Sequence, residues 1–274
     1  MAIIILPKGT TDLGTLASLN NNDLRIVEGS QTVTAGLDQS ALAADVESIT
    51  IGERAAVSFR GTSGAFLKCS IGTQFLIQSA GGRIYYTPVG AGTTTTCAKL
   101  KNIGGAQVFL AGGGTVVDLE IAGQGLVDIA DDVDVTNLYM DGGSCNQLYK
   151  STANTSWTIG AGSLTTGRGW SGTARISAGA TVNVSREDTS ATLPTGATLN
   201  MGGGALTWRG GNITTINADG DAMLDFGDAP YDLTITNLNT TWSVVKRSRF
   251  KSKFATVTIT NLNVRGGPGN YILQ

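Results

Sequence analysis

Apolar and polar residues alternate in short runs along most of the chain, and the pattern is clearest between residues 104 and 143. Val117, Leu119 and Ile121 alternate with polar residues there, and a second such run ends at Ile129. A period of two is typical of a β-strand that buries one face, so we expect Asp in place of Val117 or Ile129 to unfold the protein. The segments between runs are too short for the helix of a βαβ crossover. The pattern therefore predicts a β-solenoid, in which each strand lies on the equivalent strand of the previous coil.

The strand pattern begins near Ile49 and continues almost to the C-terminus. We therefore expect an all-β fold, a right-handed parallel β-helix (β-solenoid) over residues 47–265, followed by a tail over residues 266–274. Residues 1–46 contain an Asn run and Leu-rich pieces in place of alternation, and Asp38 suits the N-cap of a short helical turn. This N-terminal segment is expected to form an arm or a cap.

One internal repeat is explicit. The hexapeptide TITNLN occurs at Thr234–Asn239 and again at Thr258–Asn263, 24 residues later. A spacing in this range fits one coil of a three-sided parallel β-helix. Asn at a corner can adopt a left-handed conformation or bond to its own backbone, and stacked Asn side chains can bond to each other. Asn237 and Asn261 are therefore expected to belong to a ladder of side-chain hydrogen bonds.

Composition narrows the class of protein. Glycine accounts for 38 of the 274 residues and proline for only 5, without the strict Gly-X-Y period of collagen. Hydrophobic residues make up 41%, which argues against disorder, and charged residues only 15%, against about 25% in typical soluble domains. Thr, Asn, Ser and Gly take the solvent-facing positions instead. This composition is typical of β-solenoids and of extracellular or virion fibres.

Charge is distributed unevenly. Residues 1–232 hold 13 basic and 21 acidic residues, net −8, whereas residues 233–274 hold six basic and no acidic residues, net +6. As a strand, the basic segment would place alternate cations on one face and Phe250 and Phe254 on the other. That face suits an acidic neighbour, such as a second copy or another virion protein, or nucleic acid, or solvent alone. The cations of this segment are Lys246, Arg247, Arg249, Lys251 and Lys253.

Several kinds of chemistry are excluded or disfavoured. The chain has no histidine, so Ser-His-Asp and Cys-His catalysis are excluded. Cys69, Cys97 and Cys145 are odd in number and form no CxxC, which indicates structural thiols made in a reducing compartment. We expect no metal and no cofactor.

The N-terminal MAIIILPKGTT lacks a basic region before its apolar run, and no later stretch is long enough to span a membrane, so we expect neither a secretory signal nor a membrane partner.

Paired carboxylates are the remaining candidates for catalysis. Asp118 and Glu120 are expected to share the outer face of a strand, about 7 Å apart, and Asp132 and Asp134 repeat the arrangement. That spacing suits an inverting glycosidase, but any alternating strand with outward acids has it, so we interpret these acids as a solvated face. A further acidic group resembles a calcium loop without the EF-hand spacing or its closing Glu, and turn chemistry explains it better. Its members are Asp219, Asp221, Asp225 and Asp228.

The four tryptophans are expected to pack in the core or at an interface, in preference to stacking on sugar rings. They are Trp157, Trp170, Trp208 and Trp242.

The run from Leu24 to Ser40, LRIVEGSQTVTAGLDQS, together with the Gly/Thr/Asn-rich solenoid that follows it, resembles β-helical virion proteins of tailed bacteriophages, particularly those that decorate the head. The resemblance implies a non-enzymatic capsid decoration (cement) protein, expected to be a homotrimer that binds the major capsid protein. Such a protein would be made in the host cytoplasm and reside on the capsid surface of the virion. The alternative is a tailspike-like protein that binds or depolymerises a glycan. The resemblance carries over no catalytic residue.

Two segments are the candidate contacts with the capsid or with other subunits. The first is the apolar run at the N-terminus, which either orders against the capsid or folds back to cap the first coil. The second is the basic segment, for which we favour a protein partner over nucleic acid. The candidate residues are Ile3, Ile4, Ile5, Leu6, Lys246, Arg247, Arg249, Lys251 and Lys253.

Overall fold

The structure is a computed structural model, and it forms two compact units, Met1–Asn137 with Gly143–Cys145 and Leu138–Gly142 with Asn146–Gln274. The residues that the structure describes are 3–6, 22–33, 46–60, 76–79, 83–87, 96–104, 107–110, 115–129, 133–147, 154–167, 169–185 and 193–266.

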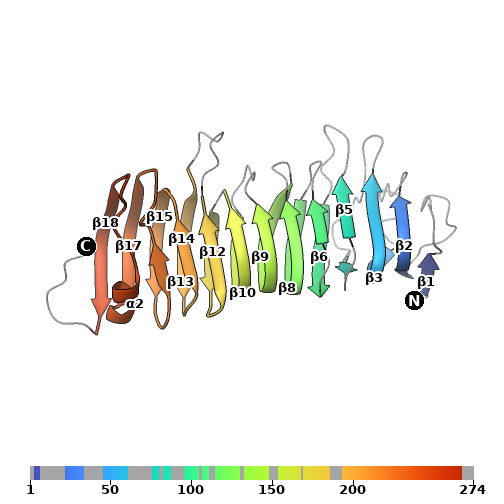
Figure 1. The fold of residues 1–274 in the computed structure, drawn as a ribbon, viewed down its shortest axis with the longest axis horizontal. Helices are drawn as coiled ribbons and strands as arrows, with labels where there is room; N and C mark the ends of the chain where they lie inside the picture. The colour runs from blue at the N-terminus through green and yellow to red at the C-terminus, as the bar shows by residue number, and fades with distance from the viewer. Residues whose placement is uncertain are drawn as a thin grey trace. The chain divides into compact units, whose positions relative to one another are not determined.

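The first unit is a stack of parallel strands (Figure 1). Strand β3 pairs with β2 before it and with both β4 and β5 after it, and β8 pairs with both β6 and β7. A long strand that pairs with two shorter ones passes round a corner of the coil. The strands are β1 (Ile3–Leu6), β2 (Asn22–Val33), β3 (Val46–Arg60), β4 (Leu76–Ser79), β5 (Arg83–Thr87), β6 (Thr96–Gly104), β7 (Gln107–Leu110), β8 (Thr115–Ile129) and part of β9 (Asp134–Gln147).

Inward-facing residues of β8 form the core of the first unit, with one change from the expected pattern. Leu119, Ile121 and Ile129 are buried, as expected. Val117 is only half-buried, and Val116 takes the inward position in its place. The reason is a corner, because Val117 and Asp118 both face outward where the strand turns. The expectation that Val117 lies inside is therefore wrong. Because this position faces outward, Val117→Asp is no longer expected to unfold the protein.

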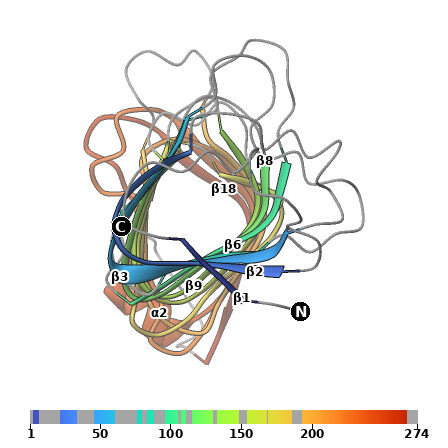
Figure 2. The ribbon, with the colours of Figure 1, turned by 90° about the vertical axis from the view of Figure 1, so that its right-hand side faces the viewer.

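The second unit repeats the same architecture with two ladders of parallel strands. One runs through β11, β13, β15, β17 and β18, and the other through β10, β12, β14 and β16 (Figures 1 and 2). The only helix in the described residues, α2 (Trp242–Arg247), lies between β17 and β18. The strands are β10 (Ser156–Thr166), β11 (Trp170–Ile176), β12 (Ala180–Val184), β13 (Thr195–Met201), β14 (Ala205–Trp208), β15 (Gly211–Ala218), β16 (Met223–Asp225), β17 (Leu233–Thr241) and β18 (Val257–Arg265). The prediction of a parallel β-solenoid is confirmed.

Three fully buried tryptophans pack against each other inside the second unit. The ring centroids of Trp157 and Trp170 are 4.7 Å apart, and those of Trp170 and Trp208 are 5.5 Å apart in an edge-on contact. The Trp170 Nε1–H donates to the Thr198 carbonyl at 2.9 Å, so its polar atom is satisfied inside the core. A Cβ at Gly196 would lie 2.7 Å from the Trp170 ring, which explains glycine there. For these three rings the expectation of core packing is confirmed.

Asparagine side chains form ladders along the outer surface of the second unit. Asn217 Nδ2 donates to Asn200 Oδ1 at 2.8 Å, and Asn239 Nδ2 donates to Asn217 Oδ1 at 2.9 Å. A second ladder joins Asn261 Nδ2 to Asn237 Oδ1 at 2.9 Å. The predicted ladder through Asn237 and Asn261 is confirmed. Because each amide bonds to the equivalent residue of the coil before it, the ladders fix the register between coils.

The N-terminal segment differs from the expected boundary. Strands β1 and β2 both lie within residues 1–46, yet β1 pairs in parallel with β2, and β2 pairs in parallel with β3. The parallel ladder therefore begins before residue 47. Its sequence basis is a short alternation, since Leu24 and Ile26 flank Arg25. The turn expected at Asp38 and the tail after Gly266 lie outside the described residues.

Candidate docking surface at the C-terminal coil

Helix α2 interrupts the second unit just before its final strand. Its N-cap residue Thr241 is extended, Val244 is buried, and the helix contacts β16 and β17. Lys246 and Arg247 occupy the last turn, where cations interact favourably with the helix dipole. The prediction that the basic segment 246–253 forms a strand is wrong, because Lys246 and Arg247 end this helix and residues 248–256 belong to no strand. The expected pairing of the two Phe side chains on one face also fails, since Phe250 is buried and Phe254 is 70% exposed.

The basic segment and the acidic group of the preceding coil neutralise each other. Asp221 pairs with Arg247, and Asp225 pairs with Arg249. Arg249 also lies 3.5 Å from Asp228. Further pairs join Lys253 to Asp228 at 3.4 Å and Arg265 to Asp219 at 3.5 Å. The group that resembled a calcium loop is therefore a row of counter-charges that ties two coils together.

Asp225 is the most buried carboxylate of this row. Its partial burial alone would raise its pKa, but hydrogen bonds from the Arg249 guanidinium and the Gly227 backbone N–H outweigh burial and hold the pKa below its usual value. The same contact raises the pKa of Arg249. The pairing with Arg249 therefore favours the ionised form of Asp225.

Two cations of the basic segment remain available to a partner. Lys246 Nζ lies 5.6 Å from the centroid of the Trp242 ring, a cation–π distance. Lys251 is exposed, and neither lysine forms an ion pair with any residue in the described part of the chain. Of the five predicted contact cations, these two therefore keep an uncompensated charge.

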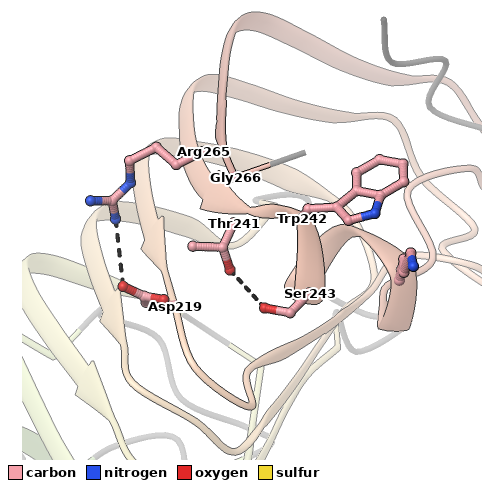
Figure 3. Close-up of a pocket in the computed structure, with 7 residues that line it drawn as sticks. Asp219, Thr241, Trp242, Ser243, Arg265 and Gly266 are labelled. Atoms are coloured by element: carbon pink, nitrogen blue, oxygen red, sulfur yellow. Dashed lines mark hydrogen bonds and ion pairs between the residues drawn. The ribbon is translucent and has the colours of Figure 1, made fainter. Parts of the chain in front are cut away.

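A shallow pocket of about 500 Å³ opens beside α2 (Figure 3). Thr241 and Ser243 share a hydrogen bond of 2.9 Å between their hydroxyl oxygens, and Trp242 presents its ring nearby. Hydroxyls, an aromatic ring and cations together suit a polar ligand with an anionic group. The lining residues are Asp219, Thr241, Trp242, Ser243, Lys246, Arg265 and Gly266.

Strand β18 carries an apolar row that a described strand covers on one side only, so that Leu262 is exposed and the other members of the row are half-buried. The row occupies the inward positions of its coil, because β18 is in register with β17 from Val257, opposite Leu233, to Arg265, opposite Thr241. Leu262 is 38% exposed, whereas its partner Leu238 is fully buried. The row consists of Val257, Ile259, Leu262 and Val264.

The paired carboxylates of β8 are engaged in bonds between coils. Asp118 Oδ1 accepts a hydrogen bond from Asn137 Nδ2 at 2.9 Å, and Glu120 lies 3.5 Å from Lys101 Nζ. These partners come from different coils on opposite sides of β8, so each acid has a structural role of its own. Asp134 is half-buried, and Asp132 lies outside the described residues.

The structure tests the remaining predicted residues, the N-terminal apolar run and the cysteines, only in part. Ile3, Ile4, Ile5 and Leu6 form β1 and pair with β2 through the backbone, and their docking role stays a prediction. Cys145 is a buried free thiol, and burial raises its pKa, with a smaller contribution from the charge of Asp128. It is therefore a structural thiol, as expected.

Comparison with known proteins adds no relative, since no family model, no curated protein and no solved structure matches the chain. Among the described residues, no group of three or more His, Cys, Asp or Glu side chains is arranged to hold a metal ion. No helix in that part of the chain has the length and apolar character needed to cross a membrane.

Proposed function

We propose that this chain is a non-enzymatic structural protein that decorates and stabilises the capsid of a tailed bacteriophage. The observation that carries the proposal is the use of outward charges as bonds between coils. Glu120 binds Lys101, Asp225 binds Arg249, and Arg265 binds Asp219. Charges used in this way make a rigid stack, and they do not converge on a reacting atom as an acid and base pair must. The virion assignment rests on the resemblance of the run from Leu24 to Ser40 and of the Gly/Thr/Asn-rich solenoid that follows it.

In this proposal the protein binds the major capsid protein as a homotrimer. Lys246 and Lys251 supply the cationic contact, because they carry charge that no described acid compensates. The apolar strand Ile3–Leu6 supplies the second contact. The net charge of −8 over residues 1–232 provides complementary surface for lateral association of subunits.

Purified virions and undecorated capsids test the proposal. A decoration protein is expected in virions at a copy number comparable with that of the major capsid protein. The double variant Lys246→Glu with Lys251→Glu should bind undecorated capsids more weakly, most clearly at low salt. Arg175→Glu, an exposed charge reversal on β11, is the matched control and should bind as the wild type does. Absence of the chain from virions would overturn the proposal.

A second candidate function, binding of an acidic glycan, is favoured by the pocket beside α2. In this alternative Trp242 stacks on a sugar ring and Lys246, which lines the same pocket, binds its carboxylate. Polygalacturonate is a suitable probe, and Trp242→Ala should abolish its binding. A few copies per virion combined with Trp242-dependent binding would favour this tailspike-like alternative over capsid decoration.

A further inference from the structure

We propose that two copies of this chain join end to end through β18, with the two strands antiparallel about a two-fold axis between Thr260 and Asn261. The interface would continue the β-sheet across the axis and bury the apolar row of both copies. The proposed interface is the edge of β18 that faces no described strand, and it is independent of capsid attachment through the cations near α2.

The first argument is the missing cover over β18. Leu233, Ile235 and Leu238 of β17 are at most 1% exposed, because β18 lies on them. Their partners on β18 have no described strand on their other side, and Leu262 is exposed to 38%. An uncovered apolar row at an open sheet edge favours association with another strand.

The second argument is self-complementarity. The apolar row is spaced symmetrically, with two residues on each side of a corner formed by Thr260 and Asn261. An antiparallel pair centred between these two residues places Val257 opposite Val264, and Ile259 opposite Leu262, in both directions. A two-fold interface requires such self-complementarity, since the same patch must serve both partners.

The third argument is the chemistry of the edge. Proteins protect open edges with proline, charged residues or bulges. Residues 257–264, VTITNLNV, contain neither proline nor a charged residue, and β18 pairs with β17 without a register shift. The first charge is Arg265 at the end of the strand, and in the antiparallel pair it faces the neutral Thr256. Nothing in the strand opposes pairing by like charge.

The asparagine ladder also supports pairing of β18 with a second copy. Asn261 donates to Asn237 of the coil before it, so its own carbonyl oxygen is the next acceptor of the ladder. In the antiparallel pair Thr260 of the second copy lies opposite Asn261, and its hydroxyl is a suitable donor. A second copy is the occupant that uses the symmetry of the row on both sides of the interface.

Molar mass in solution tests the association. Leu262→Lys places a charge at the centre of the proposed interface and should halve the mass measured by light scattering at concentrations where the wild type is associated. Leu126→Lys is a matched control, because Leu126 is 36% exposed on β8 and lies outside the interface. Its mass should equal that of the wild type. Equal masses for all three proteins, with circular dichroism showing each folded, would overturn the proposal.

Cysteine cross-linking tests the register. In the proposed pair Thr258 of one copy lies opposite Asn263 of the other. A mixture of Thr258→Cys and Asn263→Cys proteins should form a covalent dimer on mild oxidation, and neither protein alone should. Wild type is oxidised in parallel, since the chain has three native cysteines. Failure of the mixture to cross-link would exclude this register, and a mass unaffected by Leu262→Lys would exclude the interface altogether.

Discussion

Strands β17 and β18 share the sequence TITNLN, the same register and the same inward positions, yet their burial differs completely. Leu238 on β17 is fully buried, whereas Leu262 on β18 is 38% exposed. The difference comes from their neighbours, because β17 lies between β15 and β18 while β18 has a described partner on one side only. In a solenoid, therefore, the coil that follows a strand contributes to the burial of that strand, and an identical sequence becomes either a core or a docking edge.

The largest effect is expected when a charged residue replaces Leu238 or Leu262. Leu238→Asp should prevent folding of the second unit, because it leaves an unpaired charge among buried apolar side chains. Leu262→Asp should leave the unit folded, because water reaches this position. Circular dichroism and thermal unfolding of the two variants measure the contrast. Similar unfolding of both would show that β18 is covered as β17 is.

A smaller contrast is expected when each leucine is truncated. Leu238→Ala should destabilise the protein by about 2–5 kcal/mol, the usual range for a buried leucine, and Leu262→Ala by clearly less. Urea unfolding provides both values. A larger loss at Leu262 than at Leu238 would contradict the assignment of β18 as the open end.

The asparagine ladder should show the same gradient. Asn217 takes part in two side-chain bonds, to Asn200 and from Asn239, whereas Asn261 makes one, to Asn237. At about 1 kcal/mol for a typical hydrogen bond, Asn217→Ala should destabilise the protein more than Asn261→Ala. Asn212→Ala on β15, an exposed position, serves as a control in the same unfolding assay.

The smallest expected effect concerns acid. The pKa of Asp225 is lower in the folded protein than in the unfolded chain, so the stability that its pairing contributes is present above the unfolded pKa and is lost as pH falls through the folded pKa. Arg249→Gln removes the hydrogen-bonding partner of Asp225, so this variant should lose less stability as the pH falls than the wild type does. Unfolding measured between pH 7 and strongly acidic solution tests it, and an unchanged profile would show that the pair contributes nothing.

Much of the fold could be predicted from the sequence, because a solenoid is built from local patterns. Alternation predicts the strands, and the repeat of TITNLN predicts the pairing of Asn237 with Asn261. Alternation fails at corners, where two consecutive residues face outward, and this is why Val116 replaces Val117 in the core. A short helix such as α2 is also missed, since from its last residue, Arg247, cations alternate with Ser and Phe as they would along a strand.

The candidate site was less accessible to sequence reasoning. The same 24-residue shift that aligns the two TITNLN copies also aligns Asp225 with Arg249, so the pairing of acidic and basic segments was present as a signal. When the 24-residue shift is applied only to the TITNLN copies and not to the charged residues, the acidic and the basic segment look like two separate surfaces. The exposure of β18 has no signal in the strand's own composition, because it depends on whether a further strand covers its second edge.

Hydrogen exchange resolved to β17 and β18 tests the central claim, that a strand of this solenoid becomes protected when a second strand covers its edge. Backbone groups on the open side of β18 are exposed in a single copy and bonded in the proposed pair. The account predicts strong protection of Leu233–Thr241 at every protein concentration. Protection of Val257–Arg265 should rise with concentration in the wild type and stay low in Leu262→Lys. Protection of β18 that is the same at all concentrations and in both proteins would contradict it.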